Sequence, residues 1–188
     1  MKLNNTYYIL RHGLTTSNVQ HWAAGWPETK RKSHLLLKSK KQIQKTGQFF
    51  KKVGLDFIYS SDMHRTKQTA TIVSKIIKVK IIFNKNLREI NYGIFNNTDN
   101  DCYKNYFKNR TEWINKRPPK GESHIDCQKR MVETLKKIDK KHVDKKILIV
   151  SHGNPLWLLE GFVKNWNRTK LLKEYGNRIM PGEYRKLN

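Results

Sequence analysis

Short apolar runs alternate along the chain with longer segments whose apolar residues recur at helical spacing. The apolar runs are bounded by polar or turn-forming residues, which is typical of strands, and they lie at 7–10, 55–60, 81–84 and 146–151. The helical patterns lie at 35–53, 66–80 and 126–142. This alternation predicts an α/β domain with a largely parallel central sheet. A chain of 188 residues can bury roughly 70% of its unfolded surface, so we expect a single domain over residues 1–188.

Two further segments have less regular patterns. Residues 154–166 predict a helix with Pro155 in its first turn, and residues 177–187 predict a closing strand or hairpin. The connection from Gly93 to Gly121 interleaves aromatic and basic residues. Its aromatic residues fit either core packing or a partial lid that contacts the organic part of a substrate.

Several polar residues directly follow the predicted strands. Arg11, His12 and Gly13 end the first strand, and Ser151, His152 and Gly153 end the last one in the same way. Arg65 follows the second strand and Glu89 follows the third. Because ligands of parallel sheets bind at the carboxyl ends of the strands, we expect these side chains to meet at one edge.

That set of residues suits the chemistry of phosphate esters. A neutral imidazole can attack phosphorus and carry the phosphoryl group covalently. Arginines donate paired, charge-assisted hydrogen bonds to phosphate oxygens, Asn18 can add a donor, and the Gly153 N–H can bind an anion at a helix start. His152 and the arginines would stabilise the transferring group, while Glu89 would protonate the departing alcohol and later activate water.

Each of these features also has a structural interpretation. Arg11-His12-Gly13 can be a solvated strand end, Glu89 can pair with Arg88 on the surface, and Arg65 can simply occupy a first helical turn. The G-x-S-x-G pattern of a serine hydrolase is absent around His152. Their common position at strand ends favours the catalytic interpretation.

The motifs also resemble those of a known family. "RHGLTTSN", the following "GW", "IYSSDMHRTKQTA", "LREINYGIF", "PPKGES" and "ILIVSHG" occur in this order between residues 7 and 153. Together they resemble the histidine phosphatase superfamily, in its phosphoglycerate-mutase-like branch. The resemblance implies a three-layer α/β/α sandwich and a reaction through a phosphohistidine that needs no metal or other cofactor. It implies that His12 is the nucleophile, that Glu89 is the acid/base, and that Arg11, Asn18, Arg65 and His152 hold the phosphoryl group.

The chain departs from the family pattern at four positions. Leu14 stands where the family often has an acid, Trp22 where it often has a basic residue, and Ala24 where it has threonine or glutamine. We expect these three residues to border the substrate. Ser39 replaces a usual glycine, and we expect it on a helix surface.

The predicted activity is hydrolysis of a small phosphorylated metabolite. The mutases of this family carry a longer segment over the site than the modest 93–121 connection, which favours a phosphatase over phosphoglycerate-mutase-type transfer. We expect His64 and His124 near the rim of the pocket at most, and the remaining histidines on loops and surfaces.

The charge leaves one other class of function open. There are 39 basic and 15 acidic residues, for a net charge of +24, and no acid lies between Glu28 and Asp56. The basic residues of this interval include Lys30, Lys38, Lys45 and Lys52. Such a surface would attract nucleic acid or an acidic partner, which makes an anion-binding module on the same fold the alternative. An AT-rich codon bias explains an excess of lysine equally well, and we do not expect such a partner.

The remaining composition indicates a soluble, cytoplasmic protein. Two cysteines, Cys102 and Cys127, are too few for a disulfide framework and lack metal-ligand spacing. No apolar run has the length of a membrane span, and the first residues are too polar for a signal peptide.

Overall fold

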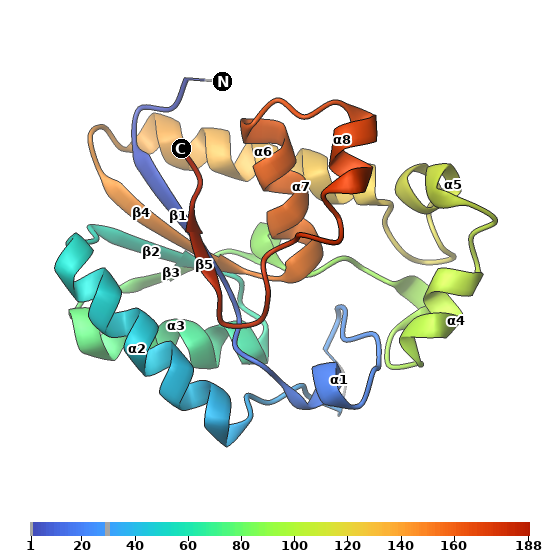
Figure 1. The fold of residues 1–188 in the computed structure, drawn as a ribbon, viewed down its shortest axis with the longest axis horizontal. Coiled ribbons are helices and arrows are strands. Elements are labelled where there is room, and N and C mark those ends of the chain that lie inside the picture. Colours follow the sequence, from blue (N-terminus) through green and yellow to red (C-terminus); the bar gives the residue numbers. More distant parts are fainter. Residues whose placement is uncertain (1, 29–30) are drawn as a thin grey trace.

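A five-stranded sheet with helices on both faces forms the centre of the protein (Figure 1). The structure is a computed structural model that describes residues 2–28 and 31–188. Lys30, which belongs to the basic interval of the sequence, lies outside the described residues. The strand order is β3-β2-β4-β1-β5. The strands are β1 (Thr6–Arg11), β2 (Phe57–Ser60), β3 (Ile81–Phe83), β4 (Lys146–Ser151) and β5 (Tyr184–Lys186).

The sheet is mostly parallel. β4 pairs in parallel with β1 on one side and with β2 on the other, and β3 is parallel to β2. Only β5 is antiparallel, against β1, which confirms a closing strand near the carboxyl end. The predicted α/β class with a largely parallel sheet is therefore confirmed.

Helices complete the two outer layers (Figure 1). Helices α2 (Leu37–Val53) and α3 (His64–Ile77) cover one face, and α6 (His124–Lys141) and α7 (Gly153–Val163) cover the other. The shorter elements are α1 (Thr16–Val19), α4 (Asn100–Asn105), α5 (Arg110–Asn115), α8 (Arg168–Lys173) and the 3₁₀ turns Lys85–Leu87 and Gly93–Phe95. None of the helices in the described part of the chain is both long and apolar enough to cross a bilayer.

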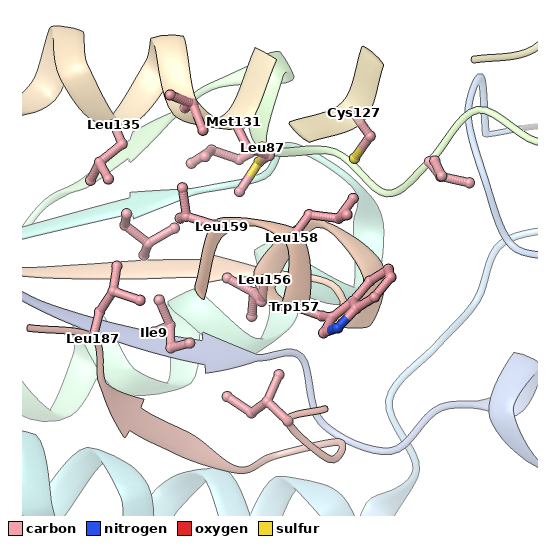
Figure 2. Close-up of a cluster of buried hydrophobic side chains, with 14 of the residues drawn as sticks. Ile9, Leu87, Cys127, Met131, Leu135, Leu156, Trp157, Leu158, Leu159 and Leu187 are labelled. Atoms are coloured by element: carbon pink, nitrogen blue, oxygen red, sulfur yellow. The ribbon is translucent and has the colours of Figure 1, made fainter. Parts of the chain in front are cut away.

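The alternation of strand side chains builds two cores. Ile147 and Ile149 of β4 face the cluster under α6 and α7, whereas Leu148 and Val150 face the cluster under α2 and α3. The first cluster includes Ile9, Met131, Leu135, Leu156 and Trp157 (Figure 2). A strand buried on both faces reads as a continuous apolar run, which is why "KILIV" identifies the central strand.

The aromatic residues of the 93–121 connection mostly pack as core. Tyr103 and Phe107 are buried, and Tyr106 and Trp113 are partly buried against the cluster under α6 and α7. Helices α4 and α5 thus attach beside the carboxyl ends of the strands by these rings (Figure 1).

Candidate functional site

The carboxyl ends of three neighbouring strands bring the predicted residues together. Arg11 at the end of β1 pairs with Ser151 at the end of β4. His12 and His152 directly follow these two residues, so they lie at the ends of adjacent strands. Ser60 pairs with Val150, which places the end of β2 on the other side of β4.

Two further predicted residues reach this edge from the segments that follow β2 and β3. Arg65 lies in the first turn of α3, and Glu89 follows the 3₁₀ turn after β3. Both join the strand-end histidines at one place, as expected.

A cavity of about 290 Å³ opens at this edge. Six of the seven predicted site residues line it, namely Arg11, His12, Asn18, Arg65, Glu89 and Gly153. His152 is not part of the lining. It is fully buried behind His12, and the two ring centroids lie 5.2 Å apart at an interplanar angle of 62°.

The orientation of His12 is set by its own backbone neighbour. Its Nδ1 lies 2.8 Å from the carbonyl oxygen of Gly13. A carbonyl only accepts hydrogen bonds, so Nδ1 carries the proton and Nε2 keeps its lone pair. Burial lowers the pKa of His12 well below its ordinary value, and the charges of Arg65 and Arg11 lower it further. The imidazole is therefore neutral and nucleophilic at Nε2.

His152 is held from the far side. Its Nε2 lies 2.9 Å from the Ser61 hydroxyl, and its Nδ1 is buried without a hydrogen-bond partner among the described residues. Burial, and then the charge of Arg65, lower the pKa of His152 well below its ordinary value. This ring is also neutral in the free protein.

The two arginines are fixed by carbonyl groups. Arg11 donates through Nη1 to the Ile179 carbonyl at 3.1 Å, and Arg65 donates through Nη2 to the Ala24 carbonyl at 2.8 Å. Arg11 Nε and Arg65 Nη1 are buried without a hydrogen-bond partner among the described residues. Glu28 Oε1 lies 4.0 Å from Arg65 Nη1, which is beyond hydrogen-bonding distance. Buried cationic donors without acceptors favour an anionic ligand.

Asn18 and Gly153 supply further donors. Asn18 Oδ1 accepts from the backbone N–H of Thr15 at 3.1 Å and from its hydroxyl at 2.8 Å, in the capping box of α1. That pair of bonds fixes the amide and leaves Nδ2 as a donor. Gly153 is the first residue of α7, and a Cβ there would lie 3.0 Å from Arg11 Cζ. Glycine thus allows the guanidinium to pack against a helix N-terminus.

Glu89 is buried, with 7% of its surface exposed. Burial raises its pKa, although the nearby charge of Arg65 acts in the opposite direction. One of its oxygens accepts the Ile90 N–H at 2.9 Å. Arg88 instead pairs with Asp62, to which its Nε donates at 2.6 Å. The alternative interpretation, in which Glu89 forms a surface ion pair with Arg88, is therefore wrong.

Several lining residues are outside the set that the sequence predicts. They are Ser17, His21, Tyr92, Asn100, Lys104, Asn154, Tyr175 and Arg178. Most come from connections without a periodic pattern, and only tertiary packing brings them to the cavity. Asn154 has a usable signal, because it directly follows "SHG" at the start of α7.

The departures from the family pattern fall in different environments. Trp22 and Ala24 line the cavity as expected, but Leu14 does not. Its backbone carbonyl instead accepts the Leu36 N–H, which ties it to the segment before α2. Ser39 is buried and not on a helix surface, because its hydroxyl faces Gly13 at the end of β1.

Of the two histidines expected near the rim at most, His124 needs correction. His124 is fully buried against Trp113, with ring centroids 3.9 Å apart, and its Nδ1 bonds to the Trp113 carbonyl at 2.8 Å. His64 pairs with His34, at 3.0 Å between Nε2 and Nδ1. Neither lines the cavity. Within residues 2–28 and 31–188, no group of three or more His, Cys, Asp and Glu side chains is arranged to hold a metal ion.

Comparison with known proteins places this geometry in context. The model of the histidine phosphatase superfamily, branch 1, matches residues 7–173. A probable phosphoglycerate mutase, GpmB, of Escherichia fergusonii is 30% identical over 157 residues, which cover 81% of this chain and 71% of that protein.

Solved structures give a similar result. YhfR of Bacillus stearothermophilus superposes with a TM-score of 0.78 at 28% identity, covering 89% of this chain and 83% of that one. A putative α-ribazole-5′-P phosphatase from Escherichia coli superposes with a TM-score of 0.80 at 19% identity, covering 95% and 87%. The second likeness supports the three-layer α/β/α fold alone.

Proposed function

The chain belongs to the histidine phosphatase superfamily, branch 1, and from that premise we propose that it is a metal-independent phosphomonoesterase whose covalent intermediate forms on His12. The proposed substrate is a small phosphorylated metabolite. The observation that carries the proposal is the state of His12: its Nδ1 proton is committed to Gly13, and its neutral ring lines a cavity with buried cationic donors.

The first step transfers the phosphoryl group to the enzyme. His12 Nε2 forms a bond to phosphorus while the bond from phosphorus to the ester oxygen breaks. Glu89 gives its proton to that oxygen, so the product leaves as an alcohol. The raised pKa of Glu89 suits this role, because it keeps more of the carboxyl protonated near neutral pH.

The second step regenerates the enzyme. Water attacks the phosphorus of phosphohistidine, the bond from Nε2 to phosphorus breaks, and ionised Glu89 takes the proton of the water. Inorganic phosphate then leaves. In both steps Arg11, Arg65 and the Asn18 amide would hold the phosphoryl oxygens, with His152 behind the His12 ring.

The test measures phosphate release from a panel of phosphomonoesters in the presence of EDTA. We expect turnover by the wild type and a loss of at least about 10³-fold in His12→Ala. His142→Ala is the matched control, because His142 caps the far end of α6 and bonds to Tyr59. Rapid quenching should trap an acid-labile, base-stable phosphoenzyme in the wild type only. Equal turnover by the wild type and His12→Ala would refute the proposal.

A second candidate is phosphoglycerate-mutase-type transfer, which the name of the Escherichia fergusonii relative favours. A mutase returns the phosphoryl group to the substrate and not to water. Incubation with 3-phosphoglycerate separates the two activities: a phosphatase releases inorganic phosphate, and a mutase forms 2-phosphoglycerate faster than phosphate appears.

A further inference from the structure

A second cavity adjoins the first one. It has a volume of about 220 Å³, and Lys104 and Tyr175 line both cavities. The other lining residues are Phe107, Asn109, Arg110 and Trp113. The two cavities thus share two walls, and the second one has aromatic side chains around it.

The rings of this cavity are fixed by their surroundings. Trp113 and Tyr175 meet edge to face with centroids 4.8 Å apart, and Trp157 supports Tyr175 from the core at 5.0 Å. The guanidinium of Arg178 lies over the Tyr175 ring, 4.0 Å from its centroid. Because these rings already have their positions, binding there would cost little conformational entropy.

The charges around the second cavity are basic. Lys104 and Arg110 line it, and no acid is among its described lining residues. Lys104 also pairs with Asp101 outside the lining, at 2.7 Å, so Arg110 is the cation of this wall that has no acid beside it in the lining. Arg110 Cζ also lies 5.8 Å from the Tyr175 centroid. A cation beside an apolar space favours the electron-rich face of an aromatic ring over a saturated group of the same size.

We propose that this second cavity is the subsite for the alcohol portion of the substrate, and that the substrate is a phosphate monoester with an aromatic ring on a short spacer. The proposal rests on the phosphomonoesterase function and specifies its substrate class. The phosphoryl group would bind at His12, the spacer would pass Lys104 and Tyr175, and the ring would lie among Phe107, Trp113 and Tyr175. The aromatic residues of the 93–121 connection would then have two roles, because they pack in the core and also form a wall of the subsite.

The test compares three series of phosphate monoesters with spacers of increasing length. One series carries a phenyl ring, the second a cyclohexyl ring and the third only the alkyl chain. The quantity is the kcat/KM of each ring compound divided by that of the alkyl compound with the same spacer. We expect this ratio to reach about tenfold for the best phenyl compound and to be smaller for its cyclohexyl counterpart.

Variants then locate the effect. Phe107 and Arg110 line the second cavity but not the first, and Phe107→Leu and Arg110→Ala should each lower the phenyl ratio at least about threefold. Phe162→Leu is the matched control, since Phe162 is a partly buried ring that packs against the same core but lines neither cavity. The ratio is taken within one enzyme preparation, so any loss of folded protein cancels.

The outcomes separate this inference from the function on which it rests. A wild type that hydrolyses all three series equally, or Phe107→Leu and Arg110→Ala variants that keep the wild-type ratio, would overturn the subsite while the phosphatase function stands. A wild type that hydrolyses none of the compounds faster than His12→Ala would overturn both.

Discussion

At the scale of single residues, burial sets the protonation states on which the proposed reaction depends. The same loss of hydration lowers the pKa values of His12 and His152 and raises the pKa of Glu89. Histidine and carboxyl groups respond in opposite directions, because burial always disfavours the charged form. One buried site thus favours both the neutral imidazole and the protonated carboxyl that the proposed reaction needs.

Glu89→Gln tests the role of the proton donor. An alkyl phosphate needs a proton on its leaving oxygen, whereas p-nitrophenol leaves readily as the anion. We expect kcat/KM of the variant to fall about 10²–10⁴-fold for an alkyl phosphate and less than about tenfold for p-nitrophenyl phosphate. With p-nitrophenyl phosphate the variant should show a burst of product, because hydrolysis of the phosphoenzyme still needs a base.

The pH dependence gives a second measurement of the same role. Glu89 must be protonated in the first step, so kcat/KM for the alkyl phosphate should fall as pH rises through the raised pKa of Glu89. Glu89→Gln should lack this alkaline limb. Equal losses for both substrates, with the limb retained, would assign the proton donor elsewhere.

At the scale of elements, the position of His12 depends on how closely the end of β1 approaches α2. A Cβ on Gly13 would lie 2.1 Å from Ser39 Oγ and 3.2 Å from both Ile43 Cγ1 and Leu35 Cδ2. Gly13 also provides the carbonyl that orients His12. The glycine of the motif is thus required by packing against α2 and the segment before it.

Gly13→Ala should therefore destabilise the protein by about 1–3 kcal/mol through overpacking. Ser39→Ala alone should be neutral or stabilising, because the Ser39 hydroxyl is buried without a hydrogen-bond partner among the described residues. In the double variant Gly13→Ala/Ser39→Ala, the close contact between the new Cβ and Ser39 Oγ is gone. The double variant should therefore be more stable than the sum of the two single effects predicts, by at least about 1 kcal/mol in the free energy of unfolding measured by urea denaturation. Additive effects of the two substitutions would contradict this contact.

The sequence predicts the positions of helices and strands better than it predicts the tertiary contacts of single residues. Helix α6 is predicted from Asp126 and begins at His124, and the capping box of Ser123 and Asp126 is the signal that marks its true start. The sequence places His124 and Ser39 on surfaces or rims, because a single polar residue has no periodicity of its own. Only the assembled layers show that one packs against Trp113 and the other against Gly13.

At the scale of the whole molecule, the strand order brings motif residues that are far apart in the sequence together at one edge of the sheet. The motif residues could be assembled from sequence because parallel strands share their carboxyl edge. The outer walls of the cavity could not be predicted in this way. Their residues Lys104, Tyr175 and Arg178 belong to short helices and turns, whose positions depend on packing of the aromatic core. The same distinction separates the reaction, which the motifs indicate, from the substrate, which we propose that the outer walls select.

Burial of histidines also makes stability depend on pH. Burial lowers the pKa of His124 to about 3, and it lowers the pKa values of His12 and His152 as well. An unfolded histidine titrates near pH ~6.5. Below that pH the unfolded chain binds protons that the folded protein does not, so the free energy of unfolding falls as pH decreases. Glu89, whose pKa is raised, contributes in the opposite sense.

Comparison of the wild type with His124→Asn isolates one of these groups, because the contributions of Glu89 and the other histidines cancel. Asparagine keeps a donor for the Trp113 carbonyl. Between about pH 6.5 and 5.5, the stability advantage of the wild type over this variant should shrink by about 1 kcal/mol in urea denaturation. For Gln44→Asn, which replaces an exposed side chain that does not titrate, the difference should stay constant. A difference for His124→Asn that does not change with pH would mean that this ring can be protonated in the folded protein, and thus that the aromatic core beneath α5 opens to water.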